Sequence, residues 1–499
     1  MGGFFGVVSK QHCVDDLFYG TDYHSHLGTV RGGMAVLSGK DKEFQRAIHD
    51  ISNAQFRTKF DSDFERFDRG GDACAGVGVI SDTDDQPLII TSHLGTYAIV
   101  TVGVITNLAA LVQELFSDRA SHFSEMSQNG INATELVAIL INSQETFVQG
   151  IRYAQLKISG SCSILILTKE GILYAVRDRY GRTPVIVGEK DDAMAVAMET
   201  SSFPNLGYQA VRDLGPGEMV KCSPEGMTTL IKPGKDLAIC AFMWVYFGYP
   251  ASSYEGQNVE IARYNCGEKL AMRNPVEADS VGGVPDSGVG HALGYAAAAG
   301  IKYARPFVKY TPTWSRSFMP QRQAEREAIA QKKLIPVPEL IKDKRLVFCD
   351  DSIVRGTQLR GQVTRLYGAG AKEIHMRIAC PPLLYQCRFL NFSRSRGAMD
   401  LLTRRIIGEI DGEKADIAPY LDADGDAYKA MVNKIQTRFD LTSLAFQRVD
   451  DLAEAIGVPL NHLCTYCFTG RDVTKPKGCQ HGCNHCASPC RVRTPQKTV

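Results

Sequence analysis

The segment RLVFCDDSIVRGTQ (residues 345–358) constrains the fold of this chain more than any other. A short apolar run ends in two adjacent acids, and SIVRGT then leads into residues with helical spacing. Strand and helix patterns alternate in the same way over residues 255–445, which predicts parallel strands and an α/β fold. Ligands bind at the carboxyl ends of the strands in such sheets, so Asp350 and Asp351 are expected at a binding edge.

The residues that follow the two acids have the chemistry of a phosphate site. Ser352, Gly356 and Thr357 supply hydroxyls and backbone N–H groups at the start of a helix, which suits a monophosphate. The two carboxylates can hold the vicinal hydroxyls of a ribose, or a Mg²⁺ ion that accompanies it. A strand end followed by a capped helix is the alternative for the acids alone, and the complete string favours the ligand site.

Residues 1 to about 235 have a different rhythm, with many short strands and few helices. Strands are expected at residues 4–8, 73–81, 96–105, 161–178 and 195–199. Apolar residues at helical spacing predict amphipathic helices over residues 106–116 and 134–148. This half should therefore be a layered α+β domain.

Composition excludes several classes of protein. The net charge of the 499 residues is +1, so no global electrostatic argument indicates binding to nucleic acid or to an anionic membrane. No apolar run approaches the roughly 18 residues of a membrane-spanning helix. Fifteen cysteines in a long chain without an export signal favour free thiols and metal sites over disulfides, and predict a cytoplasmic protein.

An ordered series of motifs resembles the amidophosphoribosyltransferase family. They are GGFFGVV, ITNLAALVQELF, RDRYGRTPVIVG, LGPGEMV, GGVPDSGVGHALGYA, RSFMPQRQAER, FCDDSIVRGTQ and CTYCFTG. The resemblance implies a glutaminase-like Ntn domain (αββα sandwich) over residues 1–235. It implies a type I phosphoribosyltransferase domain over 236–450, then a Cys-rich segment and tail over 451–499. The family forms 5-phosphoribosylamine from phosphoribosyl pyrophosphate (PRPP) in purine biosynthesis, and a homodimer or homotetramer is implied.

The same resemblance implies roles for residues of the second domain. Asp286, Ser287 and Gly288 would form the pyrophosphate loop, with Ser287, Asp350 and Asp351 near Mg²⁺. Ser352, Arg355, Gly356 and Thr357 would hold the 5′-phosphate. Lys309, Arg316 and Arg326 would lie on or near a loop that closes over substrate. KYTPTWSRSF departs from the family pattern here, which leaves open which cation meets pyrophosphate.

The glutaminase half lacks the polar residues that the family would require. Gly2 stands where the N-terminal Cys nucleophile is expected, and glycine has no side chain to attack with. Ser81 replaces an Arg that binds the glutamine carboxylate, Val102 replaces the oxyanion Asn before Gly103, and Ala133 replaces an Asp. We therefore expect no glutamine hydrolysis. Cys13 is a weak replacement nucleophile because it has no recognisable base, and packing is the better reading.

Cysteines match the ligands of a family cluster. Cys240, Cys387, Cys464 and Cys467 correspond to the four ligands of the [4Fe–4S] cluster that some members hold, and Zn²⁺ in the same thiolates is the alternative. Beyond the resemblance, the tail carries Cys479, Cys483, Cys486 and Cys490. These four could bind a second metal or belong to a redox-labile tail that binds nothing.

The leading hypothesis is a PRPP-dependent amidotransferase supplied by free ammonia, by a separate glutaminase or by an active paralogue. A regulatory or scaffold paralogue that binds PRPP or nucleotides without turnover is the second hypothesis. A phosphoribosyltransferase that uses another amine is the third. The retained acids and phosphate loop favour an active transferase.

Overall fold

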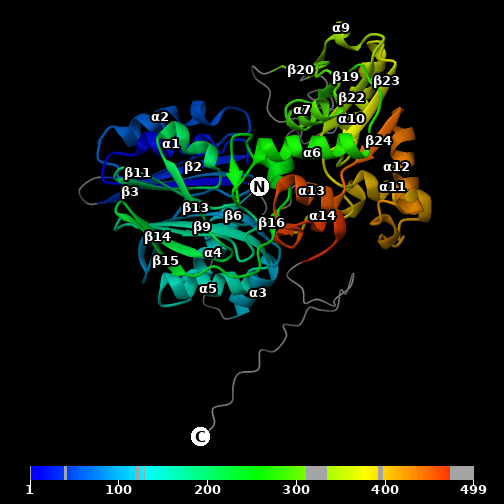
Figure 1. Cartoon of the computed structure of the whole chain (residues 1–499). Coiled ribbons are helices and arrows are strands. Elements are labelled where there is room, and N and C mark those ends of the chain that lie inside the picture. The colour runs from blue at the N-terminus through cyan, green and yellow to red at the C-terminus, as the bar shows by residue number, and fades with distance from the viewer. Residues whose placement is uncertain are drawn as a thin grey trace.

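The structure is a computed structural model that describes residues 2–38, 42–117, 123–127, 130–310, 334–390 and 397–472. Six of the residues singled out above lie outside these ranges: Arg316, Arg326, Cys479, Cys483, Cys486 and Cys490. Figure 1 shows two halves beside each other, the first running from blue to green and the second from green to red. None of the helices within the described ranges is long and apolar enough to cross a membrane.

Two antiparallel sheets form the centre of the first half. One sheet has the order β13 (Gln209–Asp213), β11 (Ile186–Lys190), β12 (Ala193–Ala197), β1 (Gly3–Ser9), β4 (Ala75–Ser81), β2 (Arg31–Ser38), β3 (Glu43–Asp50). The other has the order β15 (Gly226–Ile231), β14 (Met219–Ser223), β10 (Leu173–Val176), β9 (Gly160–Thr168), β6 (Gly95–Ile105), β5 (Leu88–Ser92). Two strands of two residues each, β7 (Met126–Ser127) and β8 (Gly130–Ile131), pair with each other outside both sheets.

The first strand is buried on both of its faces. Phe4 and Val8 point into the core between the two sheets, where they join residues of both. Phe5 and Val7 point to the opposite face and pack under helices. Because successive side chains of a strand alternate between faces, the apolar run that begins the chain fits a central strand of a layered domain.

Helices cover both outer faces of the paired sheets (Figure 1). One face packs against α1 (Val14–Asp22) and α2 (Phe56–Asp68). The other packs against α3 (Leu108–Ser117), α4 (Ala133–Asn142) and α5 (Phe147–Lys157). The expected helix over 134–148 is thus two helices, because Thr146 caps a new one by accepting a hydrogen bond from the Gln149 N–H at 3.3 Å. The four layers confirm the αββα architecture.

A parallel sheet forms the centre of the second half, as the alternating pattern predicts. Its order is β19 (Ser280–Gly283), β22 (Arg345–Asp350), β23 (Glu373–Ile378), β24 (Ser443–Phe446). The accompanying helices are α6 (Val259–Arg273), α7 (Gly288–Ala299), α9 (Pro338–Ile341), α10 (Thr357–Gly368), α11 (Leu402–Asp411) and α12 (Asp426–Arg438). The short strands β20 (Phe307–Lys309) and β21 (Leu334–Pro336) pair in antiparallel fashion.

The C-terminal segment returns to the junction between the halves. After α13 (Val449–Ile456), β25 (Leu463–Cys464) pairs in parallel with β16 (Ile239–Cys240), and α14 (Tyr466–Thr469) follows. A π-helical turn, η3 (Met243–Phe247), leads from β16 to the hairpin of β17 (Ser253–Tyr254) and β18 (Gln257–Asn258). The remaining short helical turns are η1 (Thr200–Ser202), η2 (Pro204–Leu206), η4 (Ala398–Asp400), η5 (Ala418–Tyr420) and η6 (Leu460–His462).

Candidate functional sites

The two acids lie at the carboxyl end of a central strand of the parallel sheet. Asp350 ends β22, and the N–H of Asp351 donates to its Oδ1 at 2.9 Å. Ser287 lies in the loop between β19 and α7, and its hydroxyl donates to Asp351 Oδ1 at 2.6 Å. The Ser352 hydroxyl donates to the other Asp351 oxygen at 2.5 Å. The structure therefore brings the serine of the VPDSG loop onto the acid pair.

Burial makes this acid pair electrostatically unusual. Burial, and then the charge of Asp351, raise the pKa of Asp350 well above its usual value. Burial also raises the pKa of Asp351, against hydrogen bonds from Ser287 and Ser352 and the positive charge of Arg263. Two adjacent carboxylates, one buried and one half-buried, disfavour double ionisation unless a cation is close. An all-oxygen donor set with unbalanced negative charge fits Mg²⁺, which usually takes one or two protein carboxylates together with substrate oxygens.

Two glycines allow close approach around the acids. A Cβ atom on Gly288, at the start of α7, would lie 2.2 Å from the Cys349 carbonyl oxygen, so this helix packs directly against β22. Gly356 has a φ of +76°, and a Cβ there would lie 2.6 Å from the Phe439 ring. Thr357 then begins α10, which places the helix N-terminus after the acids, as expected for phosphate binding.

The expected cations are only partly described. Lys309 forms an ion pair with the Asp286 carboxylate, so the end of β20 contacts the expected pyrophosphate loop. The carbonyl of Arg355 accepts a hydrogen bond from Arg405 at 2.7 Å, which anchors the backbone of the phosphate loop. Arg316 and Arg326 lie outside the described residues.

The first half places Gly2 at the beginning of β1, next to β4. A Cβ on Gly2 would lie 2.4 Å from the Ile80 carbonyl oxygen and 3.5 Å from the Ser81 Cα. Ser81 is therefore adjacent to Gly2, as the resemblance implies. Its hydroxyl accepts hydrogen bonds from the backbone N–H groups of Thr83 at 3.2 Å and Asp84 at 3.1 Å. Ser81 thus shapes a local turn and offers no charge to a substrate carboxylate.

The other expected glutaminase positions have no polar side chain. Val102 is buried and packs into the core between the sheets. Gly103 has a φ of +152°, and a Cβ there would lie 2.0 Å from the Ser161 carbonyl oxygen. Ala133 begins α4, whose N-terminus is held to β6 by a 2.6 Å hydrogen bond between the hydroxyls of Thr101 and Thr134.

Cys13 behaves as a packing residue. Its side chain is 2% exposed, within the core under α1. Burial, with a smaller effect from Asp16, raises the pKa of the thiol far above its usual value, so the nucleophilic thiolate is disfavoured.

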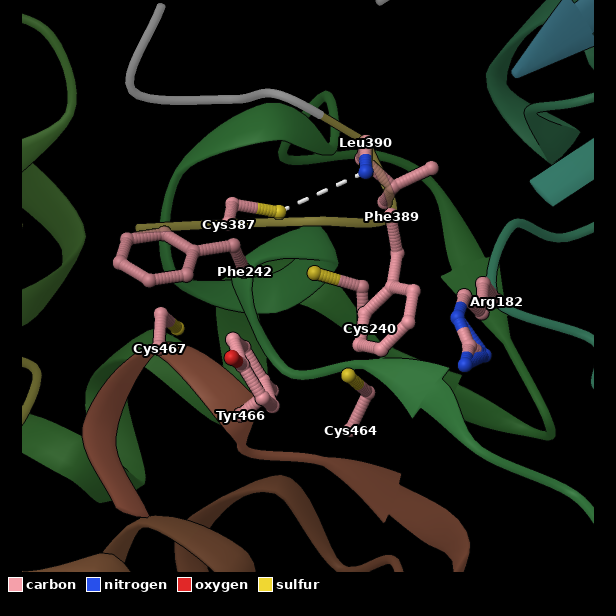
Figure 2. Close-up of a pocket in the computed structure, with 9 residues that line it drawn as sticks. All are labelled: Arg182, Cys240, Phe242, Cys387, Phe389, Leu390, Cys464, Tyr466 and Cys467. Carbon is pink, nitrogen blue, oxygen red and sulfur yellow. Dashed lines mark hydrogen bonds between the residues drawn. The ribbon is translucent and has the colours of Figure 1, made fainter. Parts of the chain in front are cut away.

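Four cysteines from three segments line one narrow pocket (Figure 2). Cys240 and Cys464 are direct partners in the pairing of β16 with β25. Cys467 lies in α14, and its carbonyl accepts hydrogen bonds from the N–H groups of Leu384 at 2.9 Å and Tyr385 at 3.0 Å. Cys387 follows in that same loop, and its sulfur accepts a 3.4 Å hydrogen bond from the Leu390 N–H. The expected ligand set therefore converges on one place.

The chemistry of this pocket fits a thiolate-bound group. Burial raises the pKa of Cys464 to about 11 and raises the pKa values of Cys240 and Cys467 further. A bound metal would therefore displace protons from neutral thiols. In the described part of the chain, no three His, Cys, Asp or Glu side chains are arranged to hold a single metal ion. Thiolate ligands suit either a [4Fe–4S] cluster or a tetrahedral Zn²⁺ ion.

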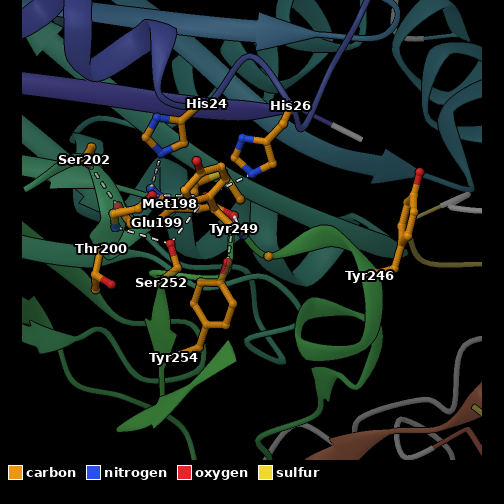
Figure 3. Close-up of polar contacts among 12 residues, drawn as sticks. His24, His26, Met198, Glu199, Thr200, Ser202, Tyr246, Tyr249, Ser252 and Tyr254 are labelled. Atoms are coloured by element: carbon orange, nitrogen blue, oxygen red, sulfur yellow. Dashed lines mark hydrogen bonds and ion pairs between the residues drawn. The ribbon is translucent and has the colours of Figure 1, made fainter. Parts of the chain in front are cut away.

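Sequence reasoning missed two buried charged groups. Arg182 lines the cysteine pocket with a side chain that is 1% exposed. Glu199, which is fully buried, accepts from the Tyr254 hydroxyl at 2.7 Å and forms an ion pair with His26 at 2.9 Å (Figure 3). A charged residue directly beside an apolar strand is the only sequence signal for either, and that signal is common on protein surfaces.

Comparisons with known proteins agree with this arrangement. Residues 75–205 match the family model described as a glutamine amidotransferase domain. The amidophosphoribosyltransferase of Bacillus subtilis is 32% identical over 85% of this chain and 88% of its own length. That of Archaeoglobus fulgidus is 31% identical over 84% of this chain and 92% of its own. The solved structure of glutamine PRPP amidotransferase from B. subtilis, complexed with ADP and GMP, superposes with a TM-score of 0.79 at 28% identity, covering 94% of this chain and 96% of that one.

Proposed function

This chain belongs to the amidophosphoribosyltransferase family of phosphoribosyltransferases, and from that premise we propose that it forms 5-phosphoribosylamine from PRPP and ammonia without hydrolysing glutamine. The observation that carries the proposal is a contrast between the two halves. Asp350 and Asp351 lie at a sheet edge, where Asp351 accepts hydrogen bonds from two serine hydroxyls and Asp350 accepts one from the Asp351 N–H. Gly2, in contrast, has neither a side chain nor room for one.

Transfer would be a direct displacement at the anomeric carbon of PRPP. The nitrogen of ammonia forms the new C–N bond, pyrophosphate leaves with the electrons of the C–O bond, and the nitrogen loses a proton to solvent. Asp350 and Asp351 would bind the ribose hydroxyls and stabilise positive charge on the ring, while Ser352, Gly356 and Thr357 hold the 5′-phosphate. Mg²⁺ held by Ser287, Asp350 and Asp351 would stabilise the negative charge of the leaving pyrophosphate.

The lack of glutaminase activity follows from four positions together. Glutamine hydrolysis would need a nucleophile at Gly2 and donors for the substrate and for the oxyanion. Ser81 is engaged in its own turn, and Val102 and Ala133 offer no polar side-chain group. Ammonia would come from solution, from a separate glutaminase or from an active paralogue.

The four pocket cysteines would hold a [4Fe–4S] cluster that ties the C-terminal segment to the second half through Cys240 and Cys387. Tetrahedral Zn²⁺ in the same four thiolates is the alternative.

We also propose the remaining assignments at the level of the whole chain. The domain boundaries would lie at residues 235 and 450. The protein would act in purine biosynthesis as a homo-oligomer.

The experiment is to incubate the purified chain with PRPP and Mg²⁺ and to measure pyrophosphate release with glutamine, with ammonium at raised pH, or with neither. Ammonium-dependent release without glutamine-dependent release is the expected result. Equal rates with glutamine would contradict the loss of the glutaminase. No release under any condition would contradict the transferase and favour a regulatory paralogue or another acceptor amine.

A further inference from the structure

Arg182 is a buried cation that has no hydrogen-bonded counter-ion among the described residues. Its side chain is 1% exposed, and none of its three guanidinium nitrogens has a hydrogen-bond partner among the described residues. The guanidinium carbon lies 3.6 Å from the centroid of the Phe389 ring and 5.0 Å from that of Tyr180. Ring faces stabilise a cation only partly, and a buried charge ordinarily has an ionic or hydrogen-bonding partner.

The backbone holds this cation at the cysteine pocket. The Arg182 carbonyl accepts a 3.0 Å hydrogen bond from the Cys240 N–H, and the Arg182 N–H donates to Asp178 at 2.6 Å. Figure 2 shows the guanidinium on the side of the pocket where Cys240 and Cys464 lie. Its charge also opposes the effect of burial on the pKa values of these two thiols. Cation and cysteines are therefore close enough to interact electrostatically.

A second buried arginine, in contrast, has a hydrogen-bond partner for each guanidinium nitrogen. Arg177, five residues earlier, donates to the carbonyls of Thr183, Leu214 and Gly181 and pairs with Glu255. Its partners are all protein groups. The corresponding partner of Arg182 is thus to be sought in the pocket that it lines.

We propose that Arg182 is the counter-ion of the thiolate-bound group in this pocket and donates N–H hydrogen bonds to its sulfur atoms. The inference rests on the proposed occupancy of the four cysteines and is independent of the amine that the transferase uses. Four thiolates around an iron–sulfur core carry a net negative charge. This charge would balance the positive charge of the guanidinium, and the sulfur atoms would accept its hydrogen bonds. Because positive charge favours the more reduced, more negative state of a cluster, Arg182 raises its reduction potential.

The test compares wild type, Arg182→Met and Arg182→Lys after anaerobic reconstitution with Fe²⁺ and sulfide. In Arg182→Met the equilibrium constant for one-electron reduction should fall about tenfold, which is about 59 mV in potential. Iron should also be lost to a chelator about tenfold faster. Arg182→Lys should restore part of both properties. Arg388→Gln is the matched control, because Arg388 is exposed and lies against Tyr466 without lining the pocket.

Thermal unfolding separates this role from a merely structural one. Without metal, Arg182→Met should be at least as stable as wild type, because it removes an unpaired buried charge; with the cluster it should be less stable. Equal potential and iron retention in Arg182→Met would overturn the proposal, and so would equal destabilisation with and without metal. A wild-type chain that binds no iron would overturn both the cluster and this role of Arg182, while leaving the transferase untouched.

Discussion

His24 is a fully buried residue whose protonation should lower the stability of the fold. Its Nδ1 lies 2.7 Å from the Gly20 carbonyl, and its Nε2 accepts from the Met198 N–H at 3.1 Å, so the hydrogen bonds select the neutral ring. Burial lowers the pKa of His24 to about 4, although the charge of Glu199 opposes this effect. The histidine of the unfolded chain, with a pKa near 6.5, binds more protons between these values.

Stability should therefore be complete above about pH 6.5 and fall as the pH falls toward 4. We expect the unfolding free energy to drop by about 2 kcal/mol from this residue between pH 7 and pH 5. Urea unfolding at both pH values measures it. His24→Gln, which can make the same two hydrogen bonds without titrating, should lose this part of the pH dependence. An identical dependence in the variant would contradict the assignment.

Gly2→Cys should not restore glutamine hydrolysis. The added Cβ would meet the Ile80 carbonyl oxygen at 2.4 Å, so β1 and β4 must separate to admit it, and the other recognition groups are still missing. We expect no glutamate release and an unfolding free energy lower by about 1–3 kcal/mol from overpacking. Glutamate release and thermal unfolding measure the two effects. Appreciable release from this single variant would contradict our alignment of the glutaminase positions.

Asp351→Asn should reduce ammonium-dependent pyrophosphate release by about 100-fold or more, since it removes the carboxylate at which charge is stabilised. The double variant with Asp350→Asn should abolish release. Glu373→Gln is the matched control, because Glu373 lies at the opposite end of the adjacent parallel strand. Near-normal turnover of Asp351→Asn with PRPP and Mg²⁺ would contradict the role of the acid pair.

The sequence predicted the acid pair but not Arg182, and the reason is physical. Asp350 and Asp351 follow an apolar strand and precede a helix, so local order alone places them at a sheet edge. The importance of Arg182 arises from burial against Phe389 and the cysteines, most of which come from segments about 200 or more residues away. Such long-range packing leaves no periodic pattern in the sequence.

At the scale of elements, the loop between β22 and α10 should depend on one glycine. Gly356→Ala would place a methyl group 2.6 Å from the Phe439 ring at a φ of +76°, so the phosphate loop must shift. We expect a loss of stability of about 1–3 kcal/mol and weaker PRPP binding. Thermal unfolding and the PRPP dependence of turnover measure these effects.

Gly361→Ala is the control within the same helix. Nothing lies within 4 Å of a Cβ at Gly361, and alanine is favoured over glycine in a helix interior, so this variant should be stabilised by about 0.5–1 kcal/mol. If the two variants changed stability and PRPP dependence equally, the special conformation of Gly356 would not matter.

Elements with strong periodicity were predicted best. The buried strands β1, β4, β6 and β9 and the parallel strand β22 all match apolar runs. The single helix predicted over 134–148 is two helices in the structure. The apolar spacing continues across the break, so it gave no sign that Thr146 caps a new helix. Strand β3, at the edge of its sheet, was not predicted because Glu43, Arg46 and Asp50 are exposed and interrupt its few apolar residues.

At the scale of the whole molecule, Glu199 links the two halves. It follows β12 of the first half and accepts hydrogen bonds from the Tyr249 N–H at 3.2 Å and the Tyr254 hydroxyl at 2.7 Å, both in the second (Figure 3). Burial opposes ionisation of Glu199, but His26, His24 and the Tyr254 hydroxyl together lower its pKa. A buried carboxylate shared by both halves should make them unfold together.

Tyr254→Phe tests this link, because it removes one donor and leaves the buried carboxylate underbonded. We expect the unfolding free energy to fall by about 1–3 kcal/mol and the thermal transition to broaden as the halves lose part of their coupling. Tyr249→Phe is the matched control, since Tyr249 donates through its backbone and its side chain is 51% exposed. If calorimetry gave Tyr254→Phe the same midpoint and width as wild type, Glu199 would not couple the halves. A comparable loss in Tyr249→Phe would show that the effect is not specific to the hydroxyl that bonds Glu199.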